Sequence, residues 1–94
     1  MNIRRLVLDV DKAIARPSLV EIAQAIEAIP GVAGFNITVL EIDVETIGTE
    51  ITIEGENLNY DALRKAIEST GAVVHSIDQL VGGRKFVEWI PRKR

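Results

Sequence analysis

The chain of 94 residues contains no cysteine, and this absence excludes disulfide bonds, zinc–thiolate sites and thiol catalysis. It contains one histidine, so a metal site with two histidine ligands is excluded as well. Aromatic residues make up only 4% of the sequence, and the apolar stretches 6–10 and 49–55 contain none. A sheet that binds RNA by stacking bases on aromatic side chains is therefore not expected.

Long hydrophobic runs are also missing. Asp9 and Asp11 interrupt the apolar run near the N-terminus, which is too short for a signal peptide, and no later run is long enough to span a bilayer. The remaining composition, 47% hydrophobic and 27% charged, is typical of a globular domain. We therefore expect one domain in the cytoplasm, with no contact to membranes.

The charge of the chain is unevenly distributed. Residues 1–83 hold six basic and thirteen acidic residues, a net charge of −7, whereas residues 84–94 hold five basic residues and one acidic residue, a net charge of +4. An acidic body is repelled by phosphate groups, so we expect no nucleic-acid partner. The sequence divides into a domain at 1–83 and a basic, aromatic C-terminal tail at 84–94.

Hydrophobic periodicity and capping residues predict six elements. Ser18 with Glu21 forms a capping box, and Asn59 is a second N-cap. The predicted elements are strand 3–10, a helix from Ser18 to Pro30, strand 35–42, a turn near Ile47-Gly48, strand 49–54, a helix from Asn59 to Gly71, and strand 72–80.

This β-α-β-β-α-β order predicts an α+β, ferredoxin-like (split β-α-β) fold. Two helices cover one face of a four-stranded antiparallel sheet with the strand order 4-1-3-2, and the other face stays open. Because the first and third strands are antiparallel neighbours, we expect Arg5 to pair with Glu54.

Residues 40–57 contain six carboxylates and no Lys or Arg. Strand alternation alone accounts for Glu50, Glu54 and Glu56, which are expected on the solvent-facing side of their strand. Carboxylates should nevertheless gather at one end of the sheet, near Lys12 and Arg16, where oxygen ligands suit Ca²⁺ or Mg²⁺. The candidate metal ligands are Asp9, Asp11, Glu41, Asp43, Glu45 and Glu50. The alternative is a solvated acidic rim that binds no metal ion.

The open face also carries a predicted apolar patch. Alternation places Val7, Leu40, Ile42 and Leu80 on this face, which an isolated subunit would expose to water. Such a patch usually marks self-association. A β-bulge near Leu40 is the alternative, since one extra residue would turn part of the patch toward the core.

Other residues offer little for catalysis. The alternation of Val73, His75 and Ile77 predicts that His75 is a buried, hydrogen-bonded residue facing the helices. Ser76 and Asp78 then lie on the open face, with no base directed at the serine. We therefore expect no enzyme within one subunit.

The tail contains two of the four aromatic residues of the chain, Phe86 and Trp89, followed by Ile90. Two arrangements would bury these side chains: the tail folds back as an edge strand, or it docks on a neighbouring subunit. Its positive charge complements the acidic domain, and docking from subunit to subunit predicts a closed ring.

The segments RRLVLDV, EIDVET, ITIEGENL and VVHSID resemble an archaeal family of small uncharacterised proteins, domain of unknown function 211. The resemblance covers residues 3–82. It implies a ferredoxin-like fold, a cytosolic archaeal protein and oligomeric rings, and it implies no established activity. The tail after Gly83 is expected to be peculiar to this member.

The sequence thus predicts a non-catalytic, ring-forming homo-oligomer with Ca²⁺, Mg²⁺ or a small ligand as a candidate at the acidic rim or subunit interface. One alternative is an interaction or scaffold module without a ligand. Another is an enzyme with a site across a subunit interface.

Overall fold

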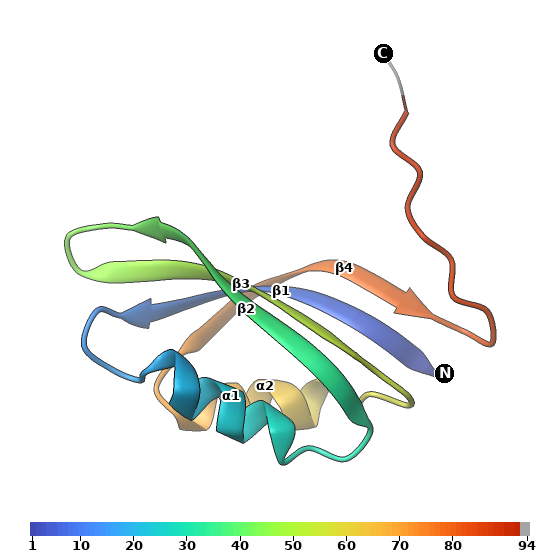
Figure 1. Ribbon diagram of the computed structural model, residues 1–94, viewed down its shortest axis with the longest axis horizontal. Helices are drawn as coiled ribbons and strands as arrows, with labels where there is room; N and C mark the ends of the chain where they lie inside the picture. The colour runs from blue at the N-terminus through green and yellow to red at the C-terminus, as the bar shows by residue number, and fades with distance from the viewer. Residues whose placement is uncertain (93–94) are drawn as a thin grey trace.

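The alternating apolar residues of Ile3–Ala13 form β1, one of the two central strands of a four-stranded sheet (Figure 1). The computed structural model describes residues 1–92. The elements that follow are α1 (Leu19–Glu27), β2 (Val32–Ile42), β3 (Thr46–Gly55), α2 (Tyr60–Ser69) and β4 (Val73–Gly82). This order confirms the predicted ferredoxin-like α+β fold.

The strands lie in the order β2-β3-β1-β4, and every neighbouring pair is antiparallel. The predicted strand order is therefore confirmed. Arg5 lies opposite Glu54 across the β1–β3 ladder, and the guanidinium Nη2 is 2.7 Å from Oε2 of Glu54. This cross-strand ion pair was expected from the antiparallel arrangement alone.

Both helices begin at the predicted caps. The Ser18 hydroxyl accepts a hydrogen bond from the backbone N–H of Glu21, whose carboxylate accepts one from the Ser18 N–H. At α2, the Asn59 side chain accepts from the backbone N–H of Ala62. These bonds satisfy N–H groups that the first turn leaves free. Neither helix of the described chain is long and apolar enough to cross a membrane.

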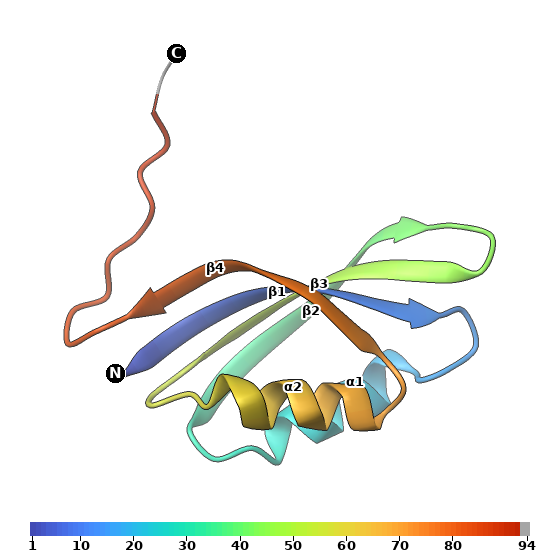
Figure 2. The same ribbon diagram turned by 180° about the vertical axis from the view of Figure 1, so that it is seen from behind.

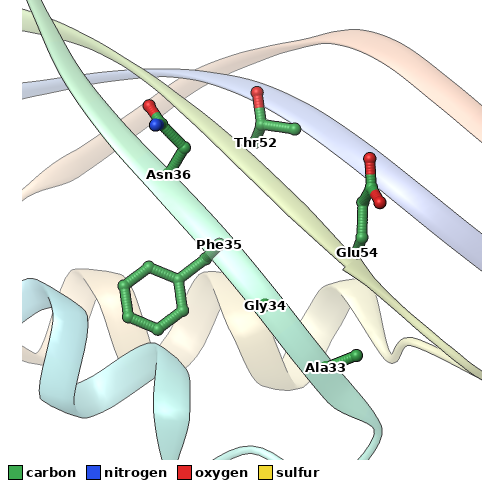
Figure 3. A pocket seen from close by; sticks show the side chains of 6 residues that line it. All are labelled: Ala33, Gly34, Phe35, Asn36, Thr52 and Glu54. Carbon is green, nitrogen blue, oxygen red and sulfur yellow. The ribbon is translucent and has the colours of Figure 1, made fainter.

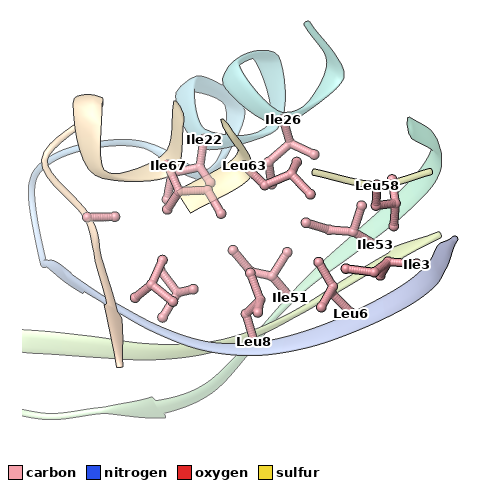
Figure 4. Close-up of a cluster of buried hydrophobic side chains, with 13 residues drawn as sticks. Ile3, Leu6, Leu8, Ile22, Ile26, Ile51, Ile53, Leu58, Leu63 and Ile67 are labelled. Carbon is pink, nitrogen blue, oxygen red and sulfur yellow. The ribbon is translucent and has the colours of Figure 1, made fainter. Parts of the chain in front are cut away.

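The helices pack side by side on one face of the sheet, and the other face is uncovered (Figures 1 and 2). Aliphatic side chains from β1, β3 and both helices fill the space between the two layers (Figure 4). The central members, all completely buried, are Leu6, Leu8, Val10, Ile22, Ile26, Ile51, Ile53, Leu63 and Ile67.

The β2–β3 hairpin is longer than predicted, and its tip extends past the helices (Figure 1). The predicted turn at Ile47-Gly48 is wrong, because both residues pair with β1 and with β2. The chain reverses instead at 43–45, where the Asp43 N–H donates to the Thr46 carbonyl at 2.8 Å. The extension of β1 to Ala13 provides the pairing partner that keeps β3 in the sheet this far.

The β1–β4 and β2–β3 ladders contain five shifts in register, and three of them change which side chains of β2 and β4 face the helices near the hairpin end of the sheet. In β2, Val39 and Glu41 occupy consecutive ladder positions and Leu40 is the extra residue. In β4, His75 and Asp78 likewise have no partner in the ladder with β1, because the residues on either side of each pair with consecutive residues of β1. Each such bulge interrupts the alternation of side chains along its strand. Patterns read from the sequence with a strict period of two therefore fail beyond these positions.

Candidate functional site

The open sheet face carries carboxylates from three neighbouring strands. Asp9 lies opposite Glu50, and Asp11 lies opposite Gly48, which in turn pairs with Glu41 of β2. A Cβ atom at Gly48 would lie 3.6 Å from Oδ1 of Asp11 and 3.7 Å from Cβ of Glu41. The missing side chain at Gly48 therefore leaves space between these two acidic residues.

This region is a shallow hollow of about 390 Å³, called here the acidic hollow. Its lining residues are Asp9, Asp11, Leu40, Glu41, Gly48, Thr49, Glu50, His75 and Asp78. Lys12, expected beside the acidic residues, is buried and donates its Nζ protons to the carbonyls of Ala13 and Ile14. No Lys or Arg lines the hollow, so its negative charge is not neutralised by the described part of the subunit.

His75 lies at this hollow and not in the core, so its predicted burial is wrong. Its side chain is 57% exposed, and Nε2 is 2.8 Å from Oδ2 of Asp11. The bulge explains the difference: Val10 pairs with Val74 and Asp9 with Ser76, which leaves His75 as the extra residue of β4. Val74 takes the helix-facing position that the sequence pattern assigned to His75.

Four of the six predicted metal ligands reach the acidic hollow, namely Asp9, Asp11, Glu41 and Glu50. Asp43 and Glu45 lie in the turn of the hairpin instead, where Oδ1 of Asp43 accepts from the backbone N–H of Val44. In residues 1–92, no group of three His, Asp or Glu side chains is arranged to hold a metal ion. The binding of a cation stays a prediction.

The polar groups beside the hollow are paired with one another. The Ser76 hydroxyl donates to Oδ1 of Asp78 at 2.7 Å, while His75 contacts Asp11. The serine is therefore bonded to a carboxylate, and the only histidine has a different partner. Nucleophilic catalysis needs a base within reach of the attacking hydroxyl, and these contacts do not provide that pairing.

The predicted apolar patch on the open face does not form as expected. Val7 does face this side, paired with Thr52 and Gln79. Leu80 lies opposite Leu6, a core residue, so it faces the helix side at the edge of the sheet. The bulges of β4 shift Leu80 away from the open face, and the bulge of β2, predicted as the alternative, likewise displaces Ile42.

The apolar residues of the hairpin are nevertheless exposed. Leu40 is 66% exposed at the bulge, Ile42 is 71% exposed and Val44, in the turn, is 86% exposed. Ile42 pairs with Ile47 on the helix-facing side, but the hairpin tip extends beyond the helices, so the bulge does not bury it (Figure 1). We call Leu40, Ile42 and Val44 the hairpin surface.

At the opposite end of the open face, Arg5 connects the sheet to the tail. Besides Glu54, its guanidinium contacts Glu88, with Nη1 2.7 Å from Oε1, and lies 4.7 Å from the ring centre of Phe86. The hydrogen bond to Glu54, assisted by Glu88 and opposed by partial burial, raises the pKa of Arg5 above its ordinary value. Phe86, predicted at a subunit interface, thus contacts its own domain.

A second hollow, the Gly34 groove, lies beside this cluster and has a volume of about 370 Å³ (Figure 3). It is lined by Ala33, Gly34, Phe35, Asn36, Thr52 and Glu54. Asn36, Thr52 and Glu54 rise from the sheet on one side, whereas the Phe35 ring points toward the helices. Gly34 has no atom within 4 Å of an added Cβ, so the groove is open above its backbone.

Comparison with known proteins assigns the chain to a family. The model of the DUF211 family, described as uncharacterized ArCR, matches residues 4–94. The chain belongs to the DUF211 family. An uncharacterized protein of Methanocaldococcus jannaschii is 44% identical over 87 residues, which cover 93% of this chain and 89% of the relative. The predicted membership in an archaeal family of unknown function is confirmed.

The DUF211 match corrects one expectation about the tail. Because the family model extends through residue 94, the tail is not peculiar to this member. The predicted tail spans 84–94, and its last two residues, Lys93 and Arg94, lie outside the described residues. Trp89 and Ile90 are 73% and 82% exposed. The described tail is not a strand of the sheet, so the predicted return as an edge strand does not occur here.

Sequence reasoning missed two features of this face. His75 was not assigned to the acidic region, and the Gly34 groove was not recognised. A signal for the groove was present in the run Ala33-Gly34, two small residues within a strand, because glycine in a strand often marks a place where another group approaches closely.

Proposed function

We propose that this DUF211 protein is a non-catalytic module that assembles with further copies of itself. The hairpin surface carries this proposal, because its three large apolar side chains are strongly exposed and the tip of the hairpin extends past the helices (Figure 1). Exposed apolar side chains that gather on one element of a small domain commonly mark a protein contact. The hairpin strand β2 is also an edge strand, and exposed apolar edges favour association with another chain.

The energetics of the hairpin surface support assembly. Burial of one large aliphatic side chain contributes about 1.5–3 kcal/mol, and the hairpin carries three that are strongly exposed. Within a subunit of 94 residues, self-association would add buried area to a core of modest size.

A closed ring is the form of assembly that the two ends of the molecule support. The hairpin surface and the tail lie at different ends of the sheet, so a subunit that uses both offers its neighbours two unlike surfaces (Figures 1 and 2). Contacts between unlike surfaces repeat until they close as a ring or continue as a fibre. The soluble, discrete outcome is the ring, and negative-stain electron microscopy would display it.

The solution mass tests the proposal directly. Size-exclusion chromatography with light scattering at micromolar concentration should give a discrete multiple of the 10.3 kDa subunit mass. Dilution should lower the mass in steps if the contacts are reversible. A single species of 10.3 kDa across the concentration range would contradict the proposed function.

The acidic hollow supports a second candidate function within the assembly, the binding of a divalent cation between subunits. Asp9 and Glu50 lie directly opposite each other on adjacent strands, and like charges in this arrangement are destabilising. A hard cation such as Ca²⁺ or Mg²⁺ would relieve this repulsion through oxygen ligands. Because one subunit lacks three converging ligands in residues 1–92, the remaining ligands would come from a neighbour.

Isothermal calorimetry on the assembled protein tests this candidate. Titration with Ca²⁺ should release or absorb heat, and the melting temperature should rise with cation concentration, since a ligand that binds only the folded state stabilises it. The matched variant Glu50→Gln should weaken both signals. If neither cation produces heat or a change in melting temperature, the protein is an interaction module without a metal ion.

A further inference from the structure

The tail presents a large aromatic side chain that its own domain leaves uncovered. Phe86 and Glu88 are both held on Arg5, and after them the chain leaves the sheet and extends into solvent (Figures 1 and 2). Val87 and Trp89, which alternate with Phe86 and Glu88 in the sequence, are strongly exposed. The contacts with Arg5 therefore hold the base of the tail on the sheet, while Trp89 stays exposed.

The Gly34 groove has the properties of a receiving site for one such side chain. Its volume of about 370 Å³ lies at the lower end of the range for protein binding pockets, about 300–1,000 Å³. Ala33 and Gly34 leave the backbone accessible, while Asn36 and Thr52 provide polar groups at the edge. A tryptophan side chain combines a large apolar surface with one N–H donor, which matches this lining.

Charge also favours the approach of a tail. A neighbouring hollow of about 250 Å³ shares Ala33 and Glu54 with the groove and is also lined by Arg4, Gly55, Glu56 and Phe86. Glu54 and Glu56 are ion-paired with Arg5 and Arg4, so the charge that favours a tail is the net charge of the whole domain. The segment that would enter carries Arg92 after Trp89 and belongs to a tail with a net charge of +4, against −7 for the domain. Opposite charges on the two surfaces increase the rate and the specificity of association.

We propose that Trp89 of one subunit inserts into the Gly34 groove of the next subunit. The inference rests on the proposed self-assembly and names one of its contacts. Insertion removes Trp89 from water, and aromatic side chains bury about 150–250 Å² each. The contact joins the tail of one subunit to the sheet face of another, so it is heterologous, and heterologous contacts can close a ring.

The fluorescence of Trp89 measures this insertion, because it is the only tryptophan of the chain. At concentrations where light scattering shows the assembly, the emission maximum should be shifted to shorter wavelength, as for a buried indole. On dilution to single subunits, it should move to the wavelength of a solvent-exposed indole. An exposed-type emission in the intact assembly would overturn the inference.

Filling the groove provides a variant that tests the partner site. Gly34→Leu places a side chain where an added Cβ meets no atom within 4 Å, so the subunit should fold normally. The leucine side chain should nevertheless keep Trp89 out of the groove, so that its emission maximum moves to the wavelength of a solvent-exposed indole. The dissociation constant of the assembly should rise at least tenfold. Gln24→Leu, at an exposed position on α1 in the opposite layer, is the matched control and should leave emission and mass unchanged.

Two further outcomes separate this inference from the proposed function. If Gly34→Leu and Trp89→Ala both keep the wild-type mass while variants of the hairpin surface dissociate, self-assembly stands and the tail contact is overturned. If the emission of Trp89 is shifted to shorter wavelength in single subunits at high dilution, the side chain docks on its own domain and the inference is again overturned. If wild-type protein is a single subunit at every concentration, both proposals fail.

Discussion

The double variant Ile42→Lys and Val44→Lys is expected to sediment and scatter light as a single subunit of 10.3 kDa. Both side chains are exposed in the subunit, so lysine at these positions changes little in the fold. In an assembly they would be buried, and the loss of two apolar contacts removes about 1.5–3 kcal/mol each. A loss of this size weakens the subunit contact at least a hundredfold.

A control separates the hairpin surface from a general effect of charge. Val20→Lys introduces the same side chain at a strongly exposed position of α1, and its assembly mass should stay that of the wild type. Circular dichroism and thermal melting should show that all variants are folded. The role assigned to the hairpin surface is refuted if the double variant keeps the mass of the wild-type assembly.

The second large effect is a loss of stability where the backbones of Gly31 and Gly55 approach each other closely, just before β2 begins. Gly55→Ala should lower the free energy of unfolding by about 1–3 kcal/mol, the usual cost of overpacking. A Cβ atom at Gly55 would lie 1.9 Å from the carbonyl oxygen of Gly31, which accepts a hydrogen bond from the Glu56 N–H. The backbone itself must move, since no flexible side chain at this position can give way.

Comparing the melting temperatures of the two single variants Gly55→Ala and Gly34→Ala measures this effect. Each kcal/mol lowers the melting temperature of a domain of this size by about 4–8 °C. Gly34→Ala, on the adjacent strand, adds a methyl group that meets nothing within 4 Å, so its melting temperature should stay close to that of the wild type. Equal melting temperatures for both variants would show that the close approach of Gly31 and Gly55 does not limit stability.

The acidic hollow and the hairpin surface meet at Leu40, which lines the hollow and also belongs to the hairpin surface. A neighbour that covers the hairpin surface would therefore lie next to the carboxylates of the hollow. This adjacency is the reason that the proposed cation site and the proposed subunit contact are tested on the assembled protein. Calorimetry on the dissociated double variant should give less heat than on the wild type.

The sequence predicted the fold because its signals are local. Apolar residues alternate in β1 and β3, and Ser18 and Asn59 mark the two helix starts through side-chain bonds within three residues. The strand order follows from the few allowed ways of connecting these elements. The Arg5–Glu54 pair could be derived in turn, because antiparallel strands fix which residues face each other.

The candidate site was predicted only in part, because it depends on register. Asp9, Asp11 and Glu50 follow the regular alternation of β1 and β3, and the structure places them where the sequence predicted, on the open face. His75 and Leu80 were misplaced because β4 contains extra residues whose positions have no mark in the sequence. A bulge arises from the balance of backbone pairing and side-chain packing between two strands, and one strand alone does not contain that information.

The sequence by itself determined the six elements, the α+β architecture and the opposite charges of domain and tail. The tertiary structure decided which side chains share a surface: it exposed the hairpin surface, brought His75 to the acidic hollow and opened the Gly34 groove beside the tail. The physical reason is the range of the interactions involved. Capping and alternation act between near neighbours in the chain, whereas ladder register and the reach of the hairpin past the helices are set by contacts among distant segments.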